Sequence, residues 1–90
     1  MSRDRFIAGL VRMPHDPTPT LLRVVCRRHG VSEAEMRAKG KKYRKVAYAR
    51  WEWFSMLRNG GMTIPKIAEA TGFDTSTIIK GIRRRKELFG

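Results

Sequence analysis

The chain has 90 residues, with 20 Lys and Arg against 8 Asp and Glu, which gives a formal net charge of +12 at pH 7. This length predicts one small domain, too short for a core plus a catalytic cleft of the usual size. So large a positive charge either destabilises the chain through repulsion between like charges or is neutralised by a bound polyanion. Nucleic acid is the first candidate partner and an anionic membrane surface the second.

The single cysteine, Cys26, excludes an intrachain disulfide framework and a cysteine-based zinc site. A reducing cytoplasm fits this composition, and a nucleic-acid partner would make the protein nucleoid-associated. The apolar patch near the N-terminus is too short for a signal-peptide core with a cleavage site, and far too short for a membrane span. We therefore expect neither export nor membrane insertion.

Residues 1–19 are predicted to be an N-terminal tail or linker, and residues 20–90 the folded domain. Pro14, Pro17 and Pro19 fix φ and remove backbone donors, which disfavours both helix and sheet. The tail could carry a contact to a protein partner.

The first predicted helix runs from a cap at Thr20 to about His29, with Gly30 as the residue that ends it. Its expected buried side consists of Leu21, Leu22, Val24 and Val25.

A short second helix is predicted to begin at Ser32, because Ser32 and Glu35 have the spacing of a capping box, and to end at Gly40. The basic segment "KGKKYRK" (39–45) follows it.

The third predicted helix runs from about Arg44 to Arg58 and stops at "NGG" (59–61). Spacings of three and four predict a buried stripe made of Tyr43, Val46, Ala47, Trp53, Phe54 and Leu57. Of the two tryptophans, Trp53 is expected to face the core and Trp51 to be the better surface candidate.

Two further helices are predicted after this stop. Thr63 caps the fourth, with Pro65 in its first turn, and Gly72 breaks it. Asp74 caps the fifth, which runs toward Leu88. No alternating strand pattern is present, so the expected fold is all-α, a small bundle of about five helices.

The segment "TIPKIAEATGFDTSTIIKGIRR" (63–84) has the spacing of a helix-turn-helix. Its expected inward residues are Ile67, Ala68, Phe73, Ile78 and Ile82, with Gly72 in the turn. Its expected outward residues are Thr75, Ser76, Thr77 and Lys80. Short hydroxyl side chains at a helix N-terminus suit contact with base edges in the major groove. In the alternative reading, residues 74–77 only cap the helix.

Two basic runs are predicted to contact DNA phosphates. One is formed by Lys80 and residues 83–86, and the other lies within residues 37–50, which hold seven basic residues and no acid. The alternative for the first run is a solvated helix face that complements the helix dipole.

Residues 20–87 resemble the C-terminal DNA-binding domain of the DnaA replication initiator family. The resemblance rests on "HGVSEAEM", "KGKKYRK", "AYARWEWF", "TIPKIAEA" and "FDTSTIIKGIRR". It implies a recognition helix in the major groove and places Arg50 where the family's arginine reaches the minor groove. Thr75 stands where the family has His, and the turn is one residue shorter. The chain contains no G-x-x-x-x-G-K-[ST] phosphate loop, so no ATPase domain is expected.

The predicted DNA-contacting residues are Lys41, Lys42, Arg44, Lys45, Arg50, Thr63, Pro65, Lys66, Asp74, Thr75, Ser76, Thr77, Lys80, Arg83 and Arg84.

No catalytic, cofactor or metal site is predicted. His15 and His29 lack an acidic or cysteine partner at metal-ligand or triad spacing, and Cys26 is expected to be a buried small hydrophobe. Trp51 could instead stack on unpaired bases.

Together these features predict a sequence-specific binder of double-stranded DNA, acting as a transcriptional regulator or replication-control factor of a phage, mobile element or related locus. The alternative is a phage-type small terminase or DNA-packaging adaptor. The oligomeric state stays open.

Overall fold

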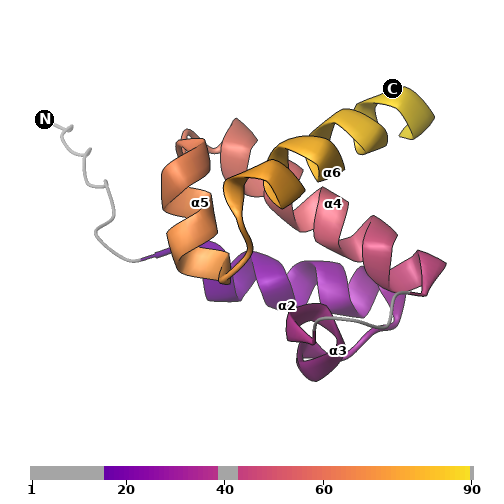
Figure 1. The fold of residues 1–90 in the computed structure, drawn as a ribbon. Helices are drawn as coiled ribbons and strands as arrows, with labels where there is room; N and C mark the ends of the chain where they lie inside the picture. The colour runs from indigo at the N-terminus through magenta and orange to yellow at the C-terminus, as the bar shows by residue number, and fades with distance from the viewer. Residues whose placement is uncertain (1–15, 39–42, 90) are drawn as a thin grey trace, which may run out of the picture.

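The chain folds into a bundle of α-helices, seen in a computed structural model that describes residues 16–38 and 43–89 (Figure 1). The helices in these ranges are α2 (Thr18–His29), α3 (Glu33–Arg37), α4 (Arg44–Asn59), α5 (Ile64–Thr71) and α6 (Thr75–Phe89). The described ranges contain no strand, so the predicted all-α class is confirmed. Lys41, Lys42, Gly40 and His15 lie outside the described residues.

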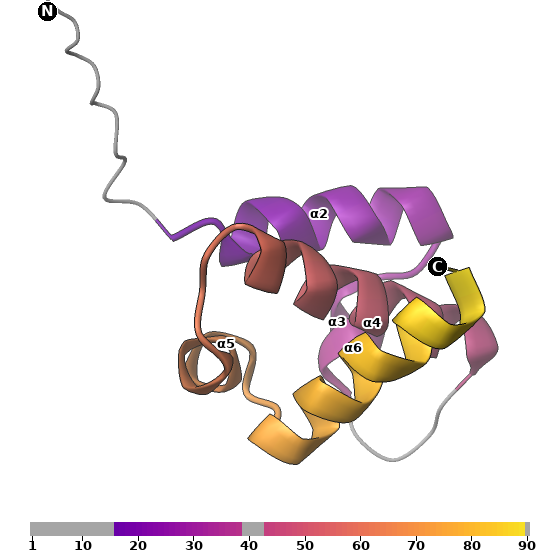
Figure 2. The ribbon, with the colours of Figure 1, turned by 90° about the horizontal axis from the view of Figure 1, so that it is seen from above.

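Helix α4 is the centre of the bundle. It lies between α2 on one side and α6 on the other, as two perpendicular views show (Figures 1 and 2). Its side chains Trp53, Phe54 and Leu57 are fully buried, together with Leu22 of α2 and Ile78 of α6. Burial of a large apolar side chain stabilises a fold by roughly 1.5–3 kcal/mol. The core therefore depends on residues of α4 that reach both neighbouring helices.

Helix α2 begins three residues earlier than predicted, with Pro17 and not Thr20 at its N-cap position. Thr20 does not cap it; the carboxylate of Asp16 instead accepts hydrogen bonds from the backbone N–H and the hydroxyl of Thr18, at 3.0 and 2.6 Å. Pro19 is compatible with this start because the first turn of a helix needs no backbone N–H from it. The helix ends at Gly30, whose φ of 67° matches the predicted left-handed cap.

The predicted capping box of α3 is confirmed. The Ser32 hydroxyl accepts from the Glu35 N–H at 3.0 Å, and the Glu35 carboxylate accepts from the Ser32 N–H at 2.8 Å. The latter hydrogen bond lowers the pKa of Glu35, because it favours the charged carboxylate. The helix ends at Arg37, before the predicted stop at Gly40.

Two residues predicted to be buried are exposed instead. Tyr43 is 58% exposed because it is the N-cap of α4 in extended conformation and so does not follow the helical period. Val24 of α2 is 38% exposed, while Cys26, two positions further along, is buried in its place. Leu21 and Ala47 are half-buried.

The α5 and α6 segment follows the predicted pattern closely. Thr63 caps α5 by accepting from the Lys66 N–H, and Pro65 lies in the first turn. Gly72 ends α5 with a φ of 84°, which glycine adopts without strain, and a three-residue turn leads to α6. Phe73 and Ile78 are buried as expected, and their side chains anchor the turn and α6 to the core.

Helices α4 and α6 approach each other closely at Gly81. A Cβ atom at this position would lie 2.7 Å from Cδ1 of Trp51 and 3.2 Å from Cδ2 of Phe54. The two helices run antiparallel: Phe54 contacts Phe73 in the turn before α6, and Tyr48, nearer the start of α4, contacts Phe89 at the end of α6. Gly81 is thus the contact point that lets α6 lie against the rings of α4.

Candidate functional site

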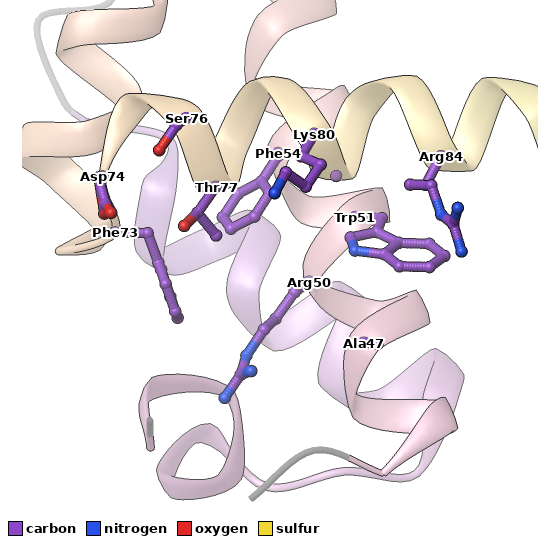
Figure 3. Close-up of a pocket in the computed structure, with 11 residues that line it drawn as sticks. Ala47, Arg50, Trp51, Phe54, Phe73, Asp74, Ser76, Thr77, Lys80 and Arg84 are labelled. Atoms are coloured by element: carbon purple, nitrogen blue, oxygen red, sulfur yellow. The ribbon is translucent and has the colours of Figure 1, made fainter. Parts of the chain in front are cut away.

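An open cleft of about 630 Å³ lies between α4 and α6 (Figure 3). One wall belongs to α4, the other belongs to α6, and the turn before α6 closes one end. The lining residues are Ala47, Arg50, Trp51, Phe54, Phe73, Asp74, Ser76, Thr77, Lys80, Gly81 and Arg84.

The α6 wall carries hydroxyls and cations in one line. Ser76, Lys80 and Arg84 are four residues apart, which places them above one another on one side of a helix, and Thr77 lies beside them. All four side chains are exposed. Thr75 and Arg83 are also exposed, but they do not line the cleft. The structure thus brings Ser76, Thr77, Lys80 and Arg84 together on one side of α6 and leaves Thr75 and Arg83 outside the cleft.

The α4 wall is largely aromatic. Phe54 is buried, whereas Trp51 is half-buried and lies beneath α6, near Arg84 in Figure 3. Trp53 faces the core, as predicted, and its Nε1–H donates to the Thr18 carbonyl at 3.1 Å. The two tryptophans therefore differ as expected, although Trp51 is a cleft residue and not a fully exposed one.

Arg50 lines the cleft, but its guanidinium is engaged within the protein, so the minor-groove contact implied by the family resemblance stays a prediction that would require these contacts to break. Its side chain is 6% exposed and points away from α6 in Figure 3. The guanidinium donates to the carbonyls of Glu35 and Met36, both at 2.9 Å, and to that of Ala38. It also lies 5.1 Å from the centroid of the Phe73 ring. Burial lowers the pKa of Arg50.

The physical reason for this placement is the end of α3. The last carbonyls of a helix have no partner within it, and a guanidinium offers several donors in a planar fork. Arg50 satisfies these carbonyls and so fixes where α3 ends, immediately before the basic segment that begins at Lys39.

The remaining predicted contacts lie at helix starts. Arg44 and Lys45 are exposed in the first turn of α4, and Thr63, Pro65 and Lys66 are exposed at the start of α5. None of these five residues lines the cleft.

Asp74 is exposed and lines the cleft, and its carbonyl accepts from the Ile78 N–H at 3.1 Å. Asp74 thus immediately precedes α6, where a cap is expected. Capping by its carboxylate stays a prediction.

A buried carboxylate that sequence reasoning missed lies behind the cleft. Glu52 is 6% exposed and pairs with Arg28 and His29 of α2, the latter at 2.6 Å, and with Arg85 of α6 at 3.7 Å. His29 therefore has an acidic neighbour that its sequence spacing did not reveal. Arg85 is partly engaged in this cluster, and is less available for phosphate than the other cations of its run.

Cys26 is buried, as predicted, and burial raises the pKa of its thiol. In the described part of the chain, no helix combines the length and apolar character that crossing a bilayer requires. Comparison with protein-family models, with curated proteins and with solved structures finds no match to the chain.

Proposed function

We propose that the chain binds double-stranded DNA in a sequence-specific way, with the N-terminal half of α6 in the major groove. The observation that supports this most is the shared direction of Ser76, Thr77, Lys80 and Arg84 along the cleft side of α6. Hydroxyls can donate to and accept from base edges, and cations flanking them can hold the phosphates that orient the helix. The net charge of +12 favours such a partner.

The other exposed residues would position the duplex. A first helix that crosses the DNA backbone is typical of helix-turn-helix docking, and the exposed start of α5 suits that role through Thr63 and Lys66. Arg44 and Lys45 would hold phosphates from the start of α4. Transcriptional regulation or replication control is the role that fits best, and it would place the protein at the nucleoid.

The test begins with a selection from randomised duplexes, which yields the preferred site. Ser76→Ala and Thr77→Ala should each weaken binding to that site by roughly 1–3 kcal/mol, because each removes a base-edge contact. Affinity for random duplex should hardly change, since the phosphate contacts remain. Fluorescence anisotropy with labelled duplexes measures both affinities.

Thr20→Ala is the matched control, because Thr20 is an exposed hydroxyl residue of α2, on the other side of α4 from α6. It should alter neither affinity. If the α6 variants stay folded and keep the ratio of specific to random affinity, these hydroxyls do not contact base edges. Residues 74–77 would then only cap the helix.

A further inference from the structure

A row of three aromatic rings extends from the cleft toward the end of α6. The ring centroid of Tyr48 lies 5.3 Å from that of Trp51 and 5.2 Å from that of Phe89. Phe89 is 58% exposed, and Trp51 and Tyr48 are half-buried. Single exposed apolar side chains are ordinary on protein surfaces, whereas aromatic rings grouped beside cations form a candidate binding surface.

Trp51 is held so that one edge is packed and the rest of the ring lines the cleft. The indole edge that carries Cδ1 and Nε1 lies against Gly81, where the absence of a side chain makes room for it. Within the described residues, the indole Nε1–H of Trp51 has no hydrogen-bond acceptor, unlike that of Trp53. This N–H lies on the edge packed at Gly81, so the face of the ring, and not the N–H, is what Trp51 offers to a ligand.

Cations accompany the aromatic row along its length. Lys80 and Arg84 line the same cleft as Trp51, and the guanidinium of Arg85 lies 5.9 Å from the ring centroid of Phe89. Proteins that bind single strands combine a positively charged groove with aromatic side chains on which bases stack. The cleft volume of about 630 Å³ lies within the range of small-ligand sites, which can hold a nucleotide.

We propose that the cleft and the aromatic row bind a segment of single-stranded DNA, with an unpaired base stacked on Trp51 and phosphates at Lys80 and Arg84. This inference rests on the proposed DNA-binding function of α6, because the same two cations would serve both ligands. Single-stranded and double-stranded DNA would therefore compete for the protein.

The intrinsic fluorescence of the chain provides a direct test. Of the two tryptophans, Trp53 is fully buried, so quenching by a short oligo(dT) strand reports on Trp51. Trp51→Leu should abolish the quenching and weaken oligo(dT) binding about tenfold, as expected for loss of one stacked base. Its affinity for random duplex should fall less than its affinity for oligo(dT), since the phosphate contacts of duplex binding remain. Ile79→Ala, which removes an exposed apolar side chain of α6 outside the cleft, is the control. It should change neither the quenching nor the affinity for oligo(dT) or for duplex.

A measurement on the wild-type protein covers the case in which Trp51→Leu unfolds. Acrylamide should quench Trp51 in the free protein, and bound oligo(dT) should protect it. Absence of protection at saturating oligo(dT), or equal loss of single-strand and duplex affinity in Trp51→Leu, would overturn the inference. Tighter binding of oligo(rU) than of oligo(dT) would overturn the choice of DNA. A protein that binds duplex but not oligo(dT) contradicts this inference alone, whereas one that binds neither contradicts the proposed function as well.

Discussion

Backbone carbonyls can hold a charged side chain inside a protein, and Arg50 is an example. A five-residue helix such as α3 leaves most of its carbonyls without partners inside the helix. Arg50 stands 12 to 15 residues further along the chain, yet its guanidinium supplies donors to three carbonyls there. A motif comparison aligns residue types only, so it could not show that this arginine is already engaged.

Arg50→Lys should therefore lower the free energy of unfolding by about 1–3 kcal/mol, because an ammonium cannot replace the planar fork and leaves buried carbonyls unpaired. Urea unfolding followed by circular dichroism measures the change. Arg44→Lys, at an exposed position of the same helix, should stay within about 0.5 kcal/mol of wild type. Unchanged stability of Arg50→Lys together with weaker duplex binding would instead favour the minor-groove contact that the family resemblance implies.

At the scale of elements, the sequence predicted correctly those helix starts and ends that depend on residues close to one another in the chain. The starts of α3 and α5 and the glycine that ends α5 follow from residues within four positions of one another, through capping and positive φ. The exposed hydroxyls of α6 also follow from local helical spacing. The Glu52 cluster and the contact at Gly81 could not be predicted, because each joins residues more than 20 positions apart.

Gly81→Ala tests the contact between α4 and α6. Alanine favours helix over glycine by roughly 1 kcal/mol, but its Cβ would overlap Trp51 and press on Phe54, which the core holds in place. Overpacking of this kind costs typically 1–3 kcal/mol, so we expect a net loss of stability in thermal unfolding. Gly60→Ala is the matched control, since its Cβ would meet only ordinary contacts at 3.4 and 3.5 Å and its φ is −79°. A stabilised Gly81→Ala protein would mean that the helices can separate at little cost.

At the scale of the whole molecule, the surplus of positive charge should appear in the salt dependence of binding. The affinity for any duplex is expected to fall with a log–log slope of roughly −4 to −8, for about five to eight phosphates neutralised. Lys80→Ala and Arg84→Ala should each reduce the slope by about 1, whereas Arg23→Ala on α2 should leave it unchanged. A flat salt response would exclude phosphate-dominated binding.

The hydrogen bond from Trp53 to the Thr18 carbonyl has a practical consequence for experiments that attach the protein to a surface. It fixes the first residue of α2 to the central helix, and α2 lies on the other side of α4 from α6. A tether or label attached at Asp16 would thus lie on the side of α4 away from the cleft. Immobilisation through that position should leave the cleft open to a ligand, whereas attachment at the end of α6 would crowd Phe89 and the aromatic row.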